Sequence, residues 1–140
     1  MNKNDNLKKK RRANDNTDTL LKLYQIYDDN RNARIWFLEE LDASDYKEYR
    51  EKYSGAPIQR SHFVAVCGFF ELSGVLVNHG LIDHDLYFQI FNPTPFWNKA
   101  KPIVQGMRSN KSDSHYYENF ESLNTKRLIW KKKRDKKYSD

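Results

Sequence analysis

Apolar residues recur with a helical period along most of this 140-residue chain, and one segment stands out from the rest. In residues 61–78, apolar side chains occupy nearly every side of a helix. A helix of that kind is normally enclosed by other elements. We therefore expect a central helix over residues 61–78, capped by Ser61 at its start and ended by Gly80 in a left-handed conformation.

Shorter amphipathic segments lie on both sides of this predicted helix, and no alternating strand pattern competes with them. Each segment begins with a residue that caps helices well. The predicted caps are Thr17 or Asp18, Asn30, Ser44, Asp83, Thr94 and Ser114. Pro57 is expected to terminate the helix before the central one, and Pro102 to kink the sixth helix. The sequence thus predicts an all-α fold, a compact bundle of six or seven short helices around a central apolar helix.

Basic residues are concentrated at the two ends of the chain. Fourteen of the 25 lysines and arginines lie in residues 1–12 and 126–140, together with three acidic residues. These two segments therefore carry a net charge of +11, and the remaining 113 residues carry −5, which leaves +6 for the chain. The isoelectric point, about 9.3, is consequently a property of the ends rather than of the body.

The two basic ends also define the predicted domain organisation. Residues 1–16 contain almost nothing that can be buried, and such a segment cannot offset its ordering entropy. We predict a flexible basic tail over residues 1–16, a helical domain over 17–125, and a basic helix end and tail over 126–140. Blocks of cations attract nucleic acid, anionic lipid or acidic proteins, although simple solvation of the chain ends is the alternative. The predicted anion-binding residues are Lys8, Lys9, Lys10, Arg11, Arg12, Lys131, Lys132, Lys133, Arg134, Lys136 and Lys137.

Composition excludes several classes of protein. Cys67 is the only cysteine, so neither an intramolecular disulfide nor a multi-thiolate metal site can form, and a reducing compartment is favoured. The basic N-terminal segment is not followed by the apolar stretch of a secretory signal. The longest apolar stretch, residues 63–77, contains Glu71 and is too short for a membrane span. We expect a cytoplasmic protein.

Glu71 is the one acidic residue inside the predicted central helix. An unpaired buried carboxylate is costly, so the sequence predicts a partner for it. Arg34 is the first candidate and Lys101 the second. We favour a structural ion pair between Glu71 and Arg34 that fixes the register of two helices, over a general base in a cleft.

Four residues with metal-binding side chains lie close together in sequence: His79, Asp83, His84 and Asp85. Their spacing matches no known metal signature, and acidic residues are expected in the first turn of any helix. We therefore predict neither a metal site nor a cofactor.

Other reactive or aromatic residues also have simple structural interpretations. His62 and His115 have no obvious nucleophile nearby in sequence, and Cys67 is expected to be a buried, inert thiol. Tyr46, Tyr49 and Tyr53 share one helix face, which we expect to pack on the core; an exposed interface patch is the alternative. These residues predict no catalytic centre and no small-molecule substrate.

Three runs of sequence carry a family resemblance. They are Phe69-Phe70-Glu71-Leu72-Ser73-Gly74, Phe96-Trp97-Asn98-Lys99-Ala100-Lys101-Pro102 and Tyr117-Glu118-Asn119-Phe120-Glu121-Ser122-Leu123. Their order resembles a family of small prokaryotic helical proteins classed only as a domain of unknown function. The resemblance covers roughly Leu20 to Leu123 and implies a helical domain with a boundary near Asn16. Many relatives carry a membrane-spanning helix ahead of the domain, where this chain has a basic segment. Because the family has no assigned chemistry, the resemblance implies no catalytic residue.

Three functional hypotheses remain at this point. The first is a non-enzymatic helical interaction module, whose body offers a surface to a protein and whose basic tails bind nucleic acid or an acidic protein without sequence specificity. The second is a peripheral protein whose tails contact an anionic membrane surface. The third is an enzyme that uses Glu71, with Arg34 or His79 beside it.

Overall fold

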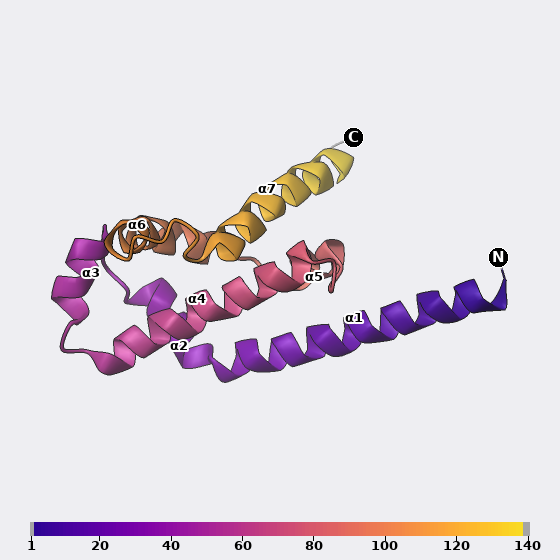
Figure 1. Cartoon of the computed structure of the whole chain (residues 1–140), viewed down its shortest axis with the longest axis horizontal. Coiled ribbons are helices and arrows are strands. Elements are labelled where there is room, and N and C mark those ends of the chain that lie inside the picture. The colour runs from indigo at the N-terminus through magenta and orange to yellow at the C-terminus, as the bar shows by residue number, and fades with distance from the viewer. Residues whose placement is uncertain (1, 139–140) are drawn as a thin grey trace.

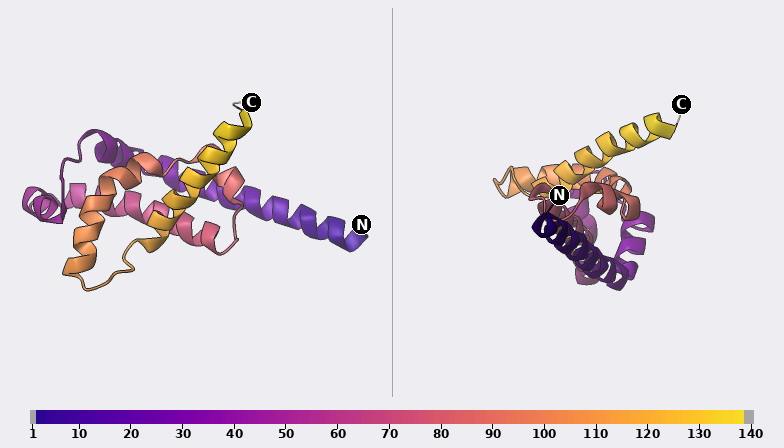
Figure 2. Two further views of the ribbon diagram at one scale, coloured as in Figure 1. Left: turned by 90° about the horizontal axis from the view of Figure 1, so that it is seen from above. Right: turned by 90° about the vertical axis from the view of Figure 1, so that its right-hand side faces the viewer.

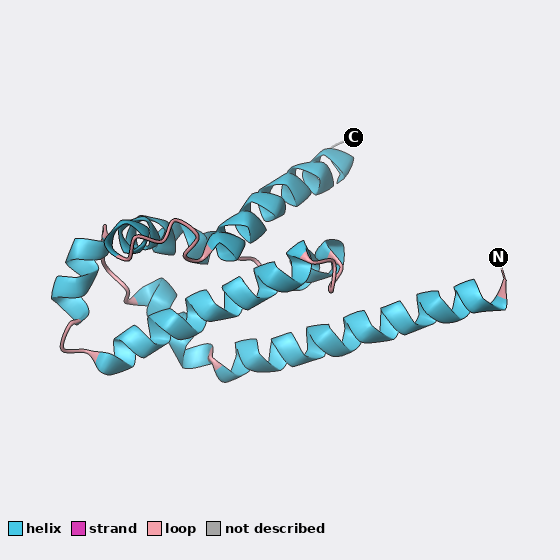
Figure 3. Cartoon of the chain, in the orientation of Figure 1, coloured by secondary structure: helices cyan, strands magenta, loops and turns pink. Residues whose placement is uncertain are grey.

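The structure is a computed structural model that describes residues 2–138 and places them in seven α-helices (Figure 1). In chain order these are α1 (Lys3–Asp29), α2 (Arg31–Glu39), α3 (Tyr46–Tyr53), α4 (Pro57–Asn78), α5 (His84–Ile90), α6 (Thr94–Asn110) and α7 (Glu118–Tyr138). No strand occurs within residues 2–138 (Figure 3), which confirms the predicted all-α fold class. Met1, Ser139 and Asp140 belong to the predicted tails and lie outside the described residues.

The apolar helix α4 forms the centre of the fold, as the sequence predicted, and packs mainly against α7 and α2. It starts at Pro57 rather than at Ser61, because proline suits the first position of a helix, where its missing N–H is not needed. By length and composition, α4 is the one helix in residues 2–138 that could cross a membrane, a test that the core helix of a globular protein also passes. Its buried residues are Phe63, Val66, Cys67, Phe69, Phe70, Ser73, Gly74 and Val77.

Aromatic rings fill the space between α4 and its neighbours. The ring centroid of Phe70 on α4 lies 4.8 Å from that of Phe96 on α6 and 5.2 Å from that of Phe120 on α7. Phe63 stacks on Phe37 of α2 with their centroids 5.6 Å apart. Pairs at these separations contribute about 0.5–1.5 kcal/mol each beyond the area that they bury. These contacts fix the positions of α2, α6 and α7 on the central helix.

The closest approach of α7 to α4 occurs at Gly74. A Cβ atom added there would overlap the backbone carbonyl of Asn119, so only glycine permits this packing. A Cβ atom at Gly68 would meet no atom within 4 Å, so a close approach of this kind occurs at Gly74 and not at Gly68. Gly80 has a φ of +68°, which confirms the predicted left-handed residue after the central helix.

The first helix is much longer than predicted. α1 begins at Lys3, so residues 3–16, predicted as a tail ahead of the first helix, are part of that helix. Leu20 and Leu23 anchor the C-terminal half of α1 in the core. Extending an existing helix is far easier than nucleating one, and lysine and arginine are good helix formers. Asn2 also caps the helix start, so the polar segment can continue α1 into solvent.

The start of α7 also differs from the prediction. α7 begins at Glu118 rather than near Ser114, because the preceding residues form a turn. Ser112 and Tyr117 have positive φ angles of 52° and 58° in this turn. Such angles are uncommon for residues other than glycine, especially for a bulky aromatic residue, and they are maintained by surrounding contacts.

The remaining caps agree with the sequence in part. Asp83 caps α5 as predicted, because its Oδ1 accepts a hydrogen bond from the backbone N–H of Leu86. The cap of α3 is Asp45 rather than Ser44. Thr94 is the first residue of α6, and Pro93 occupies the cap position.

Two helical segments extend from the same end of the packed body. The N-terminal half of α1 projects beyond the other helices, and the C-terminal half of α7 rises away from them (Figures 1 and 2). We call residues 3–16 the N-terminal arm and residues 126–138 the C-terminal arm. Because they contain the two basic clusters, these two arms carry most of the positive charge of the chain.

Candidate anion-binding interface

The carboxylate of Glu71 is bonded to the first turn of α7. Its Oε1 accepts hydrogen bonds from the backbone N of Asn119 at 3.2 Å and from the side-chain Nδ2 at 3.0 Å. Its Oε2 accepts from the backbone N of Phe120 at 2.9 Å. N–H groups in a first turn have no partner within their own helix, and a negative charge is favoured there. Glu71 therefore caps α7 from the neighbouring helix.

The predicted pairing of Glu71 with Arg34 is wrong. Arg34 lies at the junction of α1 and α2, where its Nε donates to the carbonyl of Tyr27 at 2.9 Å. Its guanidinium carbon also lies 3.6 Å from the centroid of the Tyr27 ring. Lys101, the second candidate, is an exposed residue of α6 that forms no ion pair within the described part of the chain. A buried carboxylate needs a partner, but backbone N–H groups can serve as that partner. Every residue except proline has such a group, so no pattern in the sequence identifies the groups that bond to Glu71.

The N-terminal arm presents its cations in all directions. The five residues Lys8–Arg12 are exposed, and successive residues of an α-helix are about 100° apart, so they cover its full circumference. Among residues 2–138, none of these five forms an ion pair. The arm leaves the body at a fixed point, because the side-chain oxygen of Asn16 accepts a hydrogen bond from the backbone N of Asp83 at 2.8 Å.

The C-terminal arm is equally basic. Residues Lys131–Lys133, Lys136 and Lys137 are exposed on the last three turns of α7. Arg134 is partly buried, and its Nη2 lies 3.1 Å from Oδ1 of its neighbour Asp135. That exposed pair contributes little to stability, so this carboxylate offsets one charge of the cluster without fixing its geometry.

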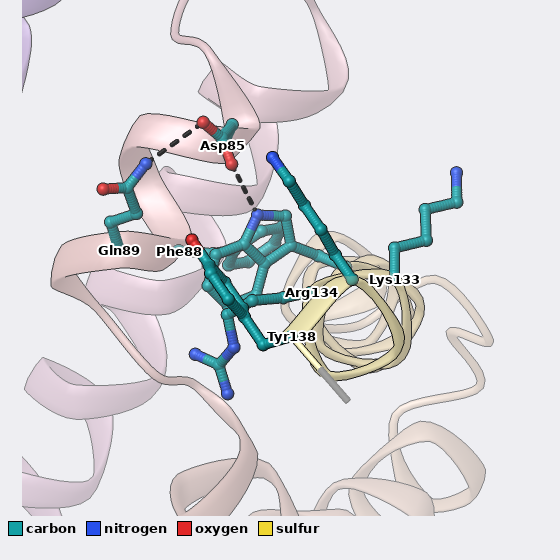
Figure 4. A pocket seen from close by; sticks show the side chains of 8 residues that line it. Asp85, Phe88, Gln89, Lys133, Arg134 and Tyr138 are labelled. Carbon is teal, nitrogen blue, oxygen red and sulfur yellow. Dashed lines mark hydrogen bonds between the residues drawn. The ribbon is translucent and has the colours of Figure 1, made fainter. Parts of the chain in front are cut away.

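A cavity of about 590 Å³ lies between α5 and the C-terminal arm. We call it the α5–α7 groove (Figure 4), and its volume falls in the range of about 300–1,000 Å³ that is usual for ligand sites. It is lined by Asp85, Phe88, Gln89, Trp130, Lys133, Arg134, Lys137 and Tyr138. The lining contains three cations and one carboxylate, so the groove carries a positive charge.

Trp130 is the most constrained residue of the α5–α7 groove. Its Nε1 donates to Oδ1 of Asp85 at 2.8 Å, and Oδ2 of Asp85 accepts from Nε2 of Gln89 at 3.1 Å (Figure 4). The guanidinium carbons of Arg127 and Arg134 lie 5.0 Å and 4.8 Å from the indole centroid. Aromatic faces attract cations at such distances. The single carboxylate of the groove is therefore already used by two protein donors.

Arg127 adds a buried positive charge beside the groove. The residue is 7% exposed, and within the described residues its Nε and Nη1 have no hydrogen-bond partner. Burial lowers the pKa of Arg127, and the nearby Arg134 cation lowers it further. Burial and the neighbouring cation both disfavour the charged form of Arg127. An anion bound near Arg127 and Arg134 would offset these two effects, so this position favours a negatively charged ligand.

A second cavity, of about 330 Å³, adjoins the α5–α7 groove. It shares Trp130 and Lys133 with the groove and extends the basic surface toward α4. Its lining residues are Val77, His84, Lys126, Ile129, Trp130 and Lys133.

The four residues with metal-binding side chains serve separate roles. His79 ends α4, Asp83 caps α5, and Asp85 accepts from Trp130. His84 lines the second cavity. Within residues 2–138, no group of three or more His, Cys, Asp or Glu residues is placed to hold a metal ion.

The remaining candidate residues lie apart from one another. Cys67 is fully buried in α4, and burial raises the pKa of its thiol well above the usual range, so the reactive thiolate is disfavoured. The ring of His62 lies 5.9 Å from that of Trp36, and Nδ1 of His115 lies 2.6 Å from a carboxylate oxygen of Glu118.

The tyrosines of α3 pack on the core. Tyr49 is 5% exposed, and Tyr46 and Tyr53 are partly buried against the core cluster, which confirms the structural interpretation of this stripe. Burial raises the pKa of Tyr49 to about 12.

Sequence reasoning missed the aromatic part of the interface. Trp130 directly precedes the basic block, and an aromatic residue beside cations is a signal that could have pointed to it. Its contacts with Asp85 and Phe88 join residues more than forty positions apart, and no local pattern reports such contacts.

A comparison with protein-family models matches residues 15–127 to a family described as "Domain of unknown function (DUF4760)". No curated protein and no solved structure matches the chain. The matched range contains the helical body, whereas Lys8–Arg12 and Lys131–Lys137 lie outside it. This match confirms the resemblance seen in the sequence. The chain belongs to this family, a domain of unknown function.

Proposed function

We propose that this protein is a non-enzymatic helical module that binds nucleic acid through its two basic arms without reading base sequence. The observation that carries the proposal is the arrangement of charge. Exposed cations that form no ion pair within residues 2–138 cover the N-terminal arm, and a second cluster lies on the C-terminal arm at the same end of the body. Nucleic acids attract such clusters, because each neutralised phosphate releases counterions.

The helical state of the arms supports this proposal. A helix that is polar on every side gains little from packing, and repulsion between neighbouring cations opposes it. Lys8–Arg12 lie on such a helix in the N-terminal arm. A polyanion that neutralises these cations would remove the repulsion and stabilise the arm. The body itself, with its net negative charge, would stay away from the phosphates.

A binding role is also favoured over catalysis by the way in which Glu71 is used. A general base must be free to accept a proton from a substrate. Both carboxylate oxygens of Glu71 already accept N–H bonds from the first turn of α7. Its role in holding α7 in place therefore accounts for a charge inside the central helix.

Nucleic acid fits the N-terminal arm better than a membrane surface does. Helices that lie in a membrane interface have a broad apolar face opposite their basic one. The N-terminal arm contains one large apolar residue, Leu7, among its polar neighbours. The cations of the N-terminal arm point to all sides of the helix. A flat membrane surface could contact only some of them at once, whereas a polyanion that wraps around or spans the arm could contact them all.

The test compares the affinity for a short DNA duplex of three proteins: the parent, an arm variant and a body variant. The arm variant replaces the five residues Lys8–Arg12 with glutamine. The body variant replaces five exposed cations of the helical body with glutamine, so that the net charge is the same. These residues are Lys22, Arg31, Lys47, Lys101 and Lys111.

We expect the arm variant to bind the duplex at least roughly 100-fold more weakly than the parent at about 50 mM salt, and the body variant to bind like the parent. Equal losses in the two variants would show that net charge alone matters and would refute a role for the arm. Tighter binding to vesicles of anionic phosphatidylserine than to DNA would favour the membrane alternative instead. Tighter binding to a polyglutamate chain than to DNA would favour an acidic protein as the partner.

A further inference from the structure

One row of planar side chains runs along α7 at the mouth of the α5–α7 groove. Trp130, Arg134 and Tyr138 are spaced four residues apart, which places them on one helix face with a rise of about 6 Å between neighbours. The guanidinium of Arg134 already lies over the indole of Trp130. Tyr138, the last member of the row, is 79% exposed. The row therefore ends in a free aromatic face.

Cations flank this row on the same helix. Lys133 and Lys137 line the groove, and neither forms an ion pair among the described residues. Figure 4 shows the ammonium group of Lys133 directed away from Asp85, toward the outside of the groove. Arg127 contributes a further positive charge, and its Nε and Nη1 have no hydrogen-bond partner among the described residues. A ligand here meets aromatic rings on one side and positive charge around them.

We propose that the α5–α7 groove binds an unpaired nucleotide of a single-stranded nucleic acid. Its base would stack on Tyr138, and the phosphates on either side of that base would contact the cations that line the groove, of which Lys133 and Arg134 point in different directions (Figure 4). Such a site combines the two elements of sequence-independent single-strand binding, a cationic groove and an aromatic stacking surface.

Single-stranded rather than duplex nucleic acid follows from the aromatic residues. In a duplex the faces of the bases are covered by their neighbours, whereas an unpaired base can be splayed out and stacked on a side chain. The arms supply affinity for any phosphate chain. The groove would add a preference for unpaired strands. This inference rests on the proposed function, because it names the class of nucleic acid that the same basic end of the molecule binds.

The intrinsic fluorescence of the protein offers a local readout. Trp36 and Trp97 are 6% and 4% exposed and lie in the core, whereas Trp130 lines the groove. A base bound beside Trp130 should quench its emission, and ligands bound on the N-terminal arm should not. A Trp130→Phe variant identifies the source of the signal, because it should lose the quenching while the arms still bind.

The experiment titrates the full chain with three probes at equal salt: a short oligodeoxythymidylate, a DNA duplex of the same length, and free thymidine monophosphate. We expect the single strand to quench the fluorescence and to bind about 10-fold more tightly than the duplex. Tyr138→Ala should weaken single-strand binding by about 5- to 100-fold, the effect of losing one stacked base, and should leave duplex binding unchanged. Tyr24→Ala, which removes another exposed tyrosine, is the matched control and should change neither affinity.

The outcomes separate this inference from the proposed function. Equal binding of strand and duplex, with no quenching and no effect of Tyr138→Ala, would overturn the groove site while leaving the arms as a nucleic-acid surface. Quenching by the free mononucleotide, with no gain in affinity for the strand, would overturn the assignment to single strands. Failure of both oligonucleotides to bind at low salt would overturn the proposed function itself.

Discussion

Replacing Glu71 with glutamine should destabilise the protein by detaching the start of α7 from α4. The carboxylate accepts three N–H bonds, two from Asn119 and one from Phe120. Glutamine has the same size but presents an NH₂ group in place of one oxygen. At least one N–H of α7 would then lose its acceptor and face another donor.

The magnitude can be worked out from these contacts. A hydrogen bond to a charged group contributes about 1.5–3 kcal/mol, and loss of a helix N-cap costs about 0.5–2 kcal/mol. Glu71 is only partly buried, so water can replace some of the lost bonds. We expect Glu71→Gln to lower the free energy of unfolding by about 2 kcal/mol, which is roughly 7 °C in Tm for a domain of this size.

The assay is chemical denaturation followed by circular dichroism, with Glu118→Gln as the control. Glu118 is also a carboxylate in the first turn of α7, but it is exposed and bonds to His115 rather than to backbone N–H groups. Its loss should cost less than about 1 kcal/mol, the usual contribution of a charge near a helix end. Hydrogen exchange gives a local check, because the Asn119 and Phe120 amides should lose protection only in the Glu71 variant. Unchanged stability of Glu71→Gln, or equal losses in both variants, would refute the capping role.

Three further predictions concern packing, the N-terminal arm and pH. Gly74→Ala should lower the free energy of unfolding by about 1–3 kcal/mol, because the new Cβ would overlap the Asn119 carbonyl. Gly68→Ala, where the Cβ meets no atom, should instead stabilise the helix by up to about 1 kcal/mol. Similar denaturation midpoints for the two variants would contradict this. Deleting residues 1–14 should change the free energy of unfolding by less than about 0.5 kcal/mol, since the described side chains there are exposed, and a large fall in Tm would show that the arm packs on the body. Burial raises the pKa of Tyr49 from 10.0 to about 12, so between these pH values the folded state keeps a proton that the unfolded state loses, and stability should fall as pH rises from about 10 to 12. Tyr49→Phe should show a smaller fall in denaturation midpoint over this range. An equal fall would exclude Tyr49 as the cause.

The parts of the fold that the sequence predicted depend on local chemistry. Residues 61–78 are apolar on nearly every side, so the place of this helix at the centre of the fold follows from its own composition, although Val64 and Leu72 stay exposed. The Asp83 cap and the left-handed Gly80 depend on backbone groups within a few positions, and both are found in the structure. Boundaries were less predictable, because the helical state of residues 3–16 depends on anchoring further along α1.

The parts that the sequence did not predict depend on contacts between distant segments. The position of Glu71 in an apolar helix predicted that its carboxylate has a partner. The partners include the backbone N–H groups of Asn119 and Phe120, which almost any residue would supply, so the sequence could not identify them. The α5–α7 groove likewise exists because α5 packs beside Trp130, and that contact depends on how the whole bundle assembles. The basic clusters were visible in the sequence. Their placement on helices at one end of the body was not.

The most direct test of the central claim is the salt dependence of duplex DNA binding. If Lys8–Arg12 contact phosphates, replacing all five with glutamine should reduce the steepness of log Kobs against log salt concentration by about 4.5, since each contact contributes about 0.9. The body variant, with the same net charge, should keep the parent slope. A slope that is unchanged in the arm variant, or reduced equally in both variants, would contradict the claim that the basic arm is the surface that binds nucleic acid.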